Sequence, residues 1–158
     1  MTLSPEIEIR LVAPHELAEP LSFLEETLRN SEPVPSLFVE QLERAVEKGY
    51  LEVLAAWREE QLIGVAVLAF RPSFSAGAPF ASIEDLYVKP EARRRGVGRK
   101  LLEAVGERCR ARGVSYVEVQ TDDEAAAFYS VLGYEPQPGA GALLFLCFLA
   151  VSFQLLFW

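Results

Sequence analysis

Apolar residues follow two different spacings in the middle of the chain, and the switch between them marks two elements. Residues 83–88 read as a buried strand that ends at Lys89 and Pro90. From Val97 onward, apolar residues recur at helical spacing as far as Gly113, which makes a good helix stop. They are Val97, Leu101, Leu102, Val105 and Cys109. The pattern therefore predicts a strand, a short turn and a helix in direct succession.

The other periodic stretches predict a mixed α/β chain. Strands are expected over residues 7–12, 51–56, 63–70 and 114–121, and amphipathic helices over residues 14–29 and 35–48. A polar turn at residues 58–61 joins the second and third of these strands like a hairpin. Residues 71–79, rich in Ser, Gly and Pro, are expected to form a loop between strands. Residues 1–158 are long enough for a single domain with one mixed core.

The turn at residues 93–98, Arg-Arg-Arg-Gly-Val-Gly, carries the most specific chemistry in the chain. A basic turn between a strand and a helix start aims free backbone N–H groups and the positive end of the helix dipole at one point, an arrangement that holds a pyrophosphate. The arginines add charge and bidentate donors. Two plainer interpretations stay open: Gly96 and Gly98 only allow a tight turn, or the arginines form a solvated face.

Two motifs within residues 82–135 resemble the core of the Gcn5-related N-acetyltransferase (GNAT) superfamily. That family's pyrophosphate loop reads Arg or Gln, two residues, Gly, one residue, Gly or Ala, and here Arg93, Gly96 and Gly98 occupy those places. Residues 125–135 resemble the family's Ala-x-x-Phe-Tyr helix closing on Leu-Gly-Phe/Tyr. The resemblance implies an α/β fold: a central, mostly antiparallel sheet, with its fourth and fifth strands parallel, flanked by helices.

The resemblance also implies an acetyl-CoA-dependent N-acetyltransferase that moves an acetyl group to a primary amine by direct transfer in a ternary complex, with no metal. The backbone of Leu86, Tyr87 and Val88 is expected to pair with the pantetheine arm like another strand. One N–H there is expected to polarise the thioester carbonyl. The pyrophosphate and the ribose phosphate are expected to lie against Arg93, Arg94, Arg95, Gly96, Val97, Gly98, Arg99 and Lys100.

Tyr129 matches the family's usual general acid. A phenol has a pKa of about 10 and a thiol one of about 8.5, so a positioned Tyr129 is a plausible proton donor to the departing thiolate. The plainer interpretation is that Phe128 and Tyr129 are both core aromatics. Phe128 and Leu132 share a helix face, so we expect Phe128 in the core and Tyr129 turned off that face, toward the site.

Removing a proton from the amine needs a base or a water relay, because an alkyl ammonium has a pKa of about 10.4. Adjacent strand residues face opposite sides of a sheet, so at most one of Glu84 and Asp85 is expected to point into the cleft. Glu84 is the first choice for base or amine anchor, and Asp85 is the alternative.

Asp122 departs from the family pattern. Many members carry there an Asn that hydrogen-bonds the pantetheine arm, and a carboxylate cannot donate as an amide does. Asp122 also suits a helix N-cap. The strand at residues 83–88 resembles that of polyamine-acetylating members, which usually carry Trp-Asn where this chain has Thr121-Asp122-Asp123. The polyamine interpretation is weaker for that reason.

The formal net charge of −8 argues against a nucleic-acid partner and suits either solubility or attraction of cationic amines. The family resemblance implies that the acceptor is a small-molecule amine, a protein N-terminus or a lysine. Cys109 and Cys147 have no metal-ligand spacing, and Cys109 is expected to be a buried thiol. With no signal pattern at the start of the chain, a cytoplasmic setting is expected.

Residues 136–158 form an atypical apolar segment without a charged residue, and residues 143–158 are polar only at Ser152 and Gln154. Three interpretations are open: a strand buried on both faces that completes the sheet and pairs with another subunit, a membrane-anchoring helix, or an end that is not native. The first predicts a homodimer. Two functional alternatives also remain, an acyl-CoA-binding sensor or partner subunit without turnover, and a membrane-associated scaffold.

Overall fold

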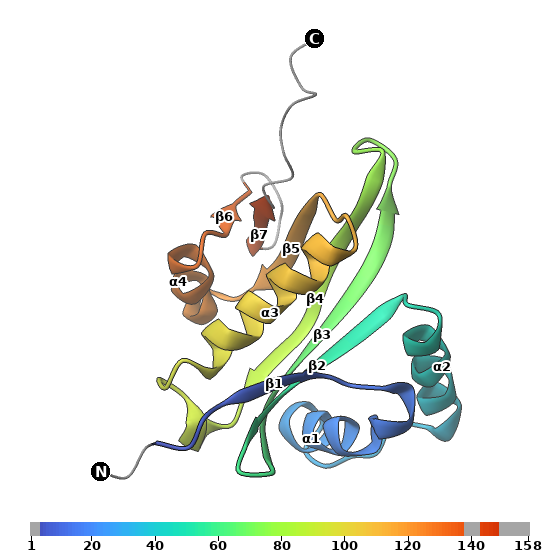
Figure 1. The fold of residues 1–158 in the computed structure, drawn as a ribbon, viewed down its shortest axis with the longest axis vertical. Coiled ribbons are helices and arrows are strands. Elements are labelled where there is room, and N and C mark those ends of the chain that lie inside the picture. Colours follow the sequence, from blue (N-terminus) through green and yellow to red (C-terminus); the bar gives the residue numbers. More distant parts are fainter. Residues whose placement is uncertain (1–3, 138–142, 149–158) are drawn as a thin grey trace.

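The computed structural model describes residues 4–137 and 143–148, whose strands form one mixed sheet covered by helices on both faces (Figure 1). The strands are β1 (Glu8–Leu11), β2 (Leu51–Arg58), β3 (Gln61–Ser73), β4 (Ala78–Val88), β5 (Tyr116–Thr121), β6 (Glu135–Pro136) and β7 (Leu143–Phe148). The α-helices are α1 (Ala18–Leu28), α2 (Ser36–Glu47), α3 (Val97–Ala111) and α4 (Asp123–Val131), with short 3₁₀ turns at Pro14–Glu16 and Pro90–Ala92. The predicted order of elements is confirmed.

Neighbouring strands in the sheet run in the order β1-β2-β3-β4-β5-β7-β6. Every neighbouring pair is antiparallel except β4 and β5, which are parallel. The fold class that the sequence predicts is therefore confirmed.

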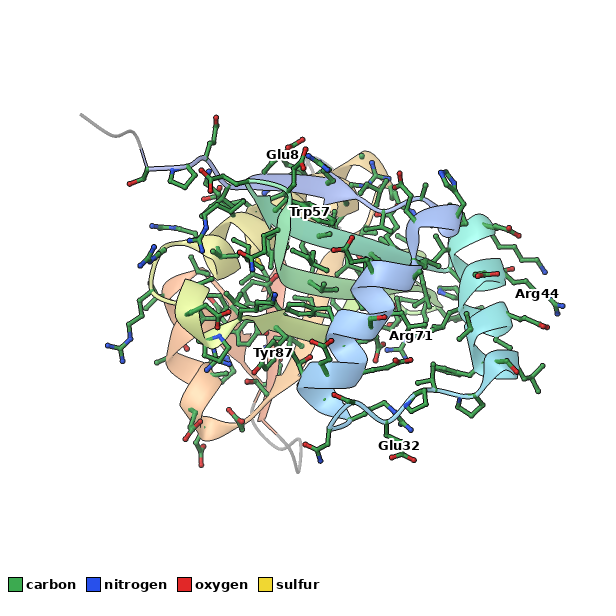
Figure 2. The ribbon with its side chains drawn as sticks, turned by 90° about the horizontal axis from the view of Figure 1, so that it is seen from below. Glu8, Glu32, Arg44, Trp57, Arg71 and Tyr87 are labelled. Carbon is green, nitrogen blue, oxygen red and sulfur yellow. The ribbon has the colours of Figure 1, made fainter. Side chains whose placement is uncertain are left out.

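Alternate residues of β2 and β3 supply the two hydrophobic cores, one on each face of the sheet. Leu54 and Ile63 belong to the core that packs against α3, whereas Val53 and Val65 belong to the core beneath α1. Figure 2 shows side chains filling the space between the sheet and the helices, with Tyr87 in the interior and Arg44 on the outer side of α2. The Tyr87 ring packs edge-on against Phe23 of α1, with 6.0 Å between centroids.

The predicted loop at residues 71–79 is too long, because the connection between the strands is confined to a turn at residues 74–77. β3 and β4 continue as one long hairpin in which Ser73 pairs with Ala78 and Pro72 with Pro79. Proline lacks an N–H and usually argues against a strand, but opposite residues of an antiparallel pair alternate between bonded and non-bonded positions. Two prolines facing each other occupy a non-bonded position, so the ladder loses no hydrogen bond there.

Part of the apolar C-terminal segment is a strand. β7 pairs with β5 on one side and with the short β6 on the other. The strand interpretation is confirmed for residues 143–148, and the helical interpretation is wrong for them. The other calls on this segment concern residues 138–142 and 149–158, which lie outside the described residues. No helix within the described ranges is long and apolar enough to cross a membrane.

A partly buried ionic cluster ties α3 to β2 beside the first core. The Glu52 side chain is 10% exposed and accepts two hydrogen bonds from Arg108, at 2.9 and 2.7 Å, and one from Arg112 at 3.2 Å. Arg112 also donates to the Gly49 carbonyl at 2.6 Å, and its guanidinium lies 3.7 Å from the Phe70 ring centroid. Burial alone would raise the pKa of Glu52, but the hydrogen bonds and charges of Arg108 and Arg112 outweigh burial and lower it.

We expect Glu52→Gln to lower the free energy of unfolding at neutral pH by roughly 2–3 kcal/mol, since it leaves two arginines without their anion. A carboxylate whose pKa is lowered on folding stabilises the protein above its unfolded pKa and loses that contribution as pH falls through the folded value. The difference in unfolding free energy between the wild type and Glu52→Gln should therefore disappear in acid, below the ordinary carboxyl pKa of 4.5.

Urea unfolding at a series of pH values measures this gap. The exposed Glu47→Gln on α2 is the matched control, expected to change the unfolding free energy by less than about 0.5 kcal/mol. A gap for Glu52→Gln that stays constant down to strong acid would contradict the ionic account.

Candidate active site

The site begins where β4 and β5 part. The two strands pair over only three positions, Ala81 with Val117 through Ile83 with Val119. At the same place β4 carries a β-bulge: Leu68 of β3 faces Ile83 and Val67 faces Asp85, which leaves Glu84 as the extra residue. A bulge bends its strand and re-aims the side chains around it. Past Ile83, no described strand pairs with the edge of β4 that faces β5.

A cavity of about 500 Å³ opens between the parted strands. Its β4 wall consists of residues 83–87, and its other wall consists of residues 119–122 with Ala125 and Tyr129 of α4. Leu86 and Tyr87, predicted to bind pantetheine, line this cavity at the unpaired edge of β4. Val88 does not line it, and its carbonyl already accepts a hydrogen bond from Arg93 at 3.0 Å.

The turn before α3 presents a row of free donors. Arg94 and Gly96 have φ of 60° and 81°, and Gly96 is the helix N-cap without a side-chain cap bond. Within the described residues, no backbone acceptor is found for the N–H groups of residues 94–99, and the first bonded amide is that of Lys100, to the Gly96 carbonyl. Consecutive free N–H groups at a helix start form an anion-binding concavity.

The basic side chains at this turn are either engaged with other residues or without a partner among the described residues. Arg93 ties the turn to the end of β4, because its Nε donates to Val88 and its guanidinium lies 5.1 Å from the Tyr87 ring centroid. Arg99 lies 3.9 Å from Glu103, and Lys100 donates to the Ile7 carbonyl at 3.4 Å. Arg94 and Arg95 are exposed, and each lacks a hydrogen-bond or ion-pair partner in the part of the chain that the structure describes.

Gly98 is explained by packing. A Cβ at this position would lie 3.0 Å from Cζ of Phe128, so the absence of a side chain lets α4 approach the first turn of α3. Val97 is buried beside it and anchors that first turn in the core. The tight-turn interpretation thus fits Gly96, whose φ is positive, but not Gly98, which lies inside the helix.

The burial of the aromatic pair of α4 differs from our expectation. Tyr129 is 6% exposed and packs edge-on between Phe128 and Tyr134, whereas Phe128 is only half-buried. Helical spacing alone assigned the core face to Phe128, but that residue lies over Gly98. Tyr129 nevertheless lines the cavity. Burial, and then the charge of Asp122, raise the pKa of Tyr129 to about 12.

Asp122 is a helix N-cap, as predicted. Its Oδ1 accepts a hydrogen bond from the Ala125 amide at 2.9 Å. Since this carboxylate has no proton to donate, it also cannot copy the amide contact that an Asn would make there. Asp122 also lines the cavity, as Asp85 and Tyr129 do.

Both carboxylates of β4 line the cavity, so the expectation that at most one could do so is wrong. The bulge at Glu84 breaks the alternation on which that expectation rested. Glu84 is exposed and lies 4.0 Å from Arg71, which in turn bonds Glu118 at 3.1 Å. Asp85 is half-buried and has no ion-pair partner among the described residues. Burial, and then the charge of Glu84, raise the pKa of Asp85.

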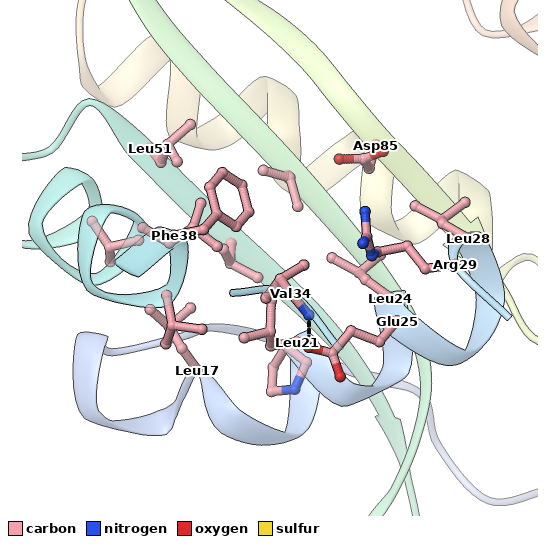
Figure 3. A pocket seen from close by; sticks show the side chains of 16 residues that line it. Leu17, Leu21, Leu24, Glu25, Leu28, Arg29, Val34, Phe38, Leu51 and Asp85 are labelled. Atoms are coloured by element: carbon pink, nitrogen blue, oxygen red, sulfur yellow. Dashed lines mark hydrogen bonds between the residues drawn. The ribbon is translucent and has the colours of Figure 1, made fainter. Parts of the chain in front are cut away.

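A second cavity, of about 210 Å³, lies between the sheet and helices α1 and α2 (Figure 3). It meets the first cavity at a shared wall, because Asp85 and Leu28 line both. The sequence did not reveal it: residues 17–49 show only the amphipathic spacing of two ordinary helices. The apolar faces of those two helices are the one sequence feature that could have indicated an apolar cavity beneath them.

Other reactive groups lie away from this site. Cys109 is fully buried, as predicted, and burial raises the pKa of its thiol to about 12. Among the described residues, no group of three or more His, Cys, Asp or Glu side chains is placed to hold a metal ion.

A model of the acetyltransferase (GNAT) family matches residues 17–134 of the chain. A curated relative, the chloroplastic serotonin N-acetyltransferase 2 of Oryza sativa subsp. japonica, is 30% identical over 103 residues, which are 64% of this chain and 50% of that protein. The chain therefore spans about half the length of that relative.

Solved structures share the fold. An aminoglycoside acetyltransferase from an uncultured soil metagenomic sample superposes with a TM-score of 0.74 at 26% identity, over 84% of this chain and 93% of that one. A PaiA N-acetyltransferase from Thermoplasma acidophilum, in complex with coenzyme A, has a TM-score of 0.65 at 17% identity, over 90% and 99%. With the family model matching from α1 to the end of α4, the chain belongs to the acetyltransferase (GNAT) family.

Proposed function

We propose that the protein is an acetyl-CoA-dependent N-acetyltransferase that acetylates a primary amine by direct transfer in a ternary complex. The observation that carries this proposal is the parting of β4 and β5 beside a turn with six backbone N–H groups that have no acceptor among the described residues. Tyr129 and Asp85 lie on the walls of the resulting cavity. Family membership supports the acetyl transfer, and a structural neighbour holds coenzyme A.

The free donors fit the two polar parts of the cosubstrate. The N–H groups of residues 94–99, with the free guanidinium groups of Arg94 and Arg95, suit the pyrophosphate. The unpaired edge of β4 at Leu86 and Tyr87 suits the amide groups of the pantetheine arm, as in strand addition. One backbone N–H of this edge would polarise the thioester carbonyl. Arg93 holds the two binding segments together.

We assign the proton transfers to Asp85 and Tyr129. The amine nitrogen attacks the thioester carbon, the C–S bond breaks, and the amine must lose a proton while the thiolate must gain one. Asp85, rather than Glu84, is the group to anchor the ammonium and take its proton directly or through water, because Glu84 lies near Arg71. Tyr129 donates to the sulfur. Burial is the main cause of the raised pKa of Tyr129, and burial would raise the pKa of the departing thiol in the same direction.

Calorimetry with acetyl-CoA, followed by thiol release with a panel of primary amines, tests the proposal. Binding with thiol release supports the enzyme, and binding without release across the panel favours the sensor or partner-subunit alternative. If acetyl-CoA does not bind, both the enzyme proposal and the sensor or partner-subunit alternative are overturned. The homodimer and the cytoplasmic setting stay predictions.

We expect Tyr129→Phe to lower kcat by about 100-fold, the usual contribution of a positioned general acid, while the Kd for acetyl-CoA stays within about twofold. The hydroxyl is the only group removed, and the ring keeps its contacts with Phe128 and Tyr134. Tyr134→Phe is the matched control, because Tyr134 is equally buried but does not line the cavity. Equal effects of the two substitutions on kcat would remove Tyr129 from the acid role.

We expect Asp85→Asn to lower kcat/KM for amines by about 100-fold and to change its pH dependence. The carboxylate form is the one that binds the ammonium or takes its proton. With a raised pKa, that form appears at higher pH than for an ordinary aspartate, so the acid limb of the wild-type profile should lie above 3.8. This limb should vanish in Asp85→Asn and persist in Glu84→Gln. An acid limb that persists in Asp85→Asn and vanishes in Glu84→Gln would instead assign the role of base or amine anchor to Glu84.

A further inference from the structure

The cavity beneath α1 and α2 differs from the first one in the chemistry of its wall. Its lining is almost entirely apolar, with side chains such as Leu21, Leu24, Val34 and Val53. Figure 3 shows Leu21, Leu24 and Val34 around this cavity. Only three lining side chains carry charge, namely Glu25, Arg29 and Asp85. A cavity with this wall binds apolar groups and excludes polar groups that find no partner in it.

Two of the three charged side chains are already engaged within the chain. Oε1 of Glu25 accepts a hydrogen bond from the Val34 amide at 3.2 Å, drawn as a dashed line in Figure 3. The Arg29 side chain donates to the Glu32 carbonyl at 3.1 Å and lies 3.8 Å from the Glu32 carboxylate. Within the described residues, Asp85 is thus the charged group of this lining that has no hydrogen bond or ion pair.

Asp85 stands at the wall that this cavity shares with the one between β4 and β5. An ammonium group at Asp85 could extend its carbon skeleton into the aliphatic cavity while its nitrogen stays beside the site of transfer. Tyr129 lies on the far wall of that neighbouring cavity. The second cavity therefore lies where the non-reacting part of an acceptor would be held.

We propose that the preferred substrates are primary amines with a compact apolar body, such as arylalkyl or branched alkyl amines, because the cavity under α1 and α2 would hold that body. This inference rests on the proposed acetyl transfer. The volume of the cavity, about 210 Å³, supports this inference. An apolar cavity of about 150 Å³ in another protein takes up benzene, so one ring with a short linker fits here.

The apolar lining of the cavity beneath α1 and α2 disfavours polyhydroxylated and polycationic acceptors. A sugar hydroxyl or a second ammonium placed among Leu21, Leu24 and Val53 would lose its water without gaining a partner. An aminoglycoside acetyltransferase shares this fold, but an aminoglycoside would carry several such groups into the cavity. We expect it to be a poor substrate of this chain.

Steady-state kinetics on the full chain with saturating acetyl-CoA tests the selection directly. We expect kcat/KM for 2-phenylethylamine and 3-methylbutylamine to exceed that for ethanolamine and 1,4-diaminobutane by about 100-fold or more, since a single buried methylene gives about 10-fold. Equal or faster turnover of ethanolamine, of 1,4-diaminobutane or of an aminoglycoside would overturn the inference and leave the proposed function standing. Failure of all amines would instead overturn the proposed function.

A pair of variants locates the selectivity. Val34→Phe fills the cavity from the segment before α2 and should raise KM for 2-phenylethylamine by about 10-fold or more, with the Kd for acetyl-CoA within about twofold. Leu37→Phe adds the same ring at an exposed position of α2 outside the lining and should leave that KM unchanged. Thermal melting of both variants verifies folding. Equal KM values for the two folded variants would contradict a binding role for the cavity.

Discussion

The short parallel contact between β4 and β5 is the constraint on which the site depends. Three paired positions hold the strands together, and the bulge at Glu84 then turns β4 away. The edge of β4 becomes available to a ligand, a cavity opens, and both carboxylates line it. β5 leads directly into Asp122, whose cap starts α4 and places Tyr129 on the opposite wall. A longer parallel pairing would close the cavity and pair the edge of β4 with β5.

Helix α3 serves two purposes at its two ends. Its first turn is left without a cap, so its N–H groups and the positive end of its dipole stay open to an anion. Its last turn carries Arg108, followed by Arg112, where positive charge is favoured by the dipole, and Glu52 fixes both to β2. The free energy that orders this helix therefore comes from its packed face and its far end, and the N–H groups at its start can remain without acceptors.

Features set by short-range chemistry could be predicted from the sequence: the helix after Gly96, the N-cap at Asp122 and the family motifs. Features that depend on distant partners could not. The bulge at Glu84 follows from the register between β3 and β4, which no local pattern encodes. The burial of Tyr129 depends on which element lies against α4, and periodicity alone does not say which helix face meets the core. The Glu52 cluster joins residues 56 and 60 positions apart.

The contact between Gly98 and Phe128 has an evolutionary consequence. The two positions belong to different motifs, one in the turn proposed to bind pyrophosphate and one beside the proposed acid, yet 3.0 Å separates the ring from the place that a Cβ at 98 would occupy. A methyl group at 98 would require the half-buried Phe128 ring to shift by a few tenths of an ångström, whereas a larger side chain would displace the ring, so the residues at the two positions are expected to change together when 98 becomes large. Among relatives, alanine at this position should occur together with the aromatic ring, whereas a larger residue should come with a smaller one at 128, and the pair would record how closely the two helices approach.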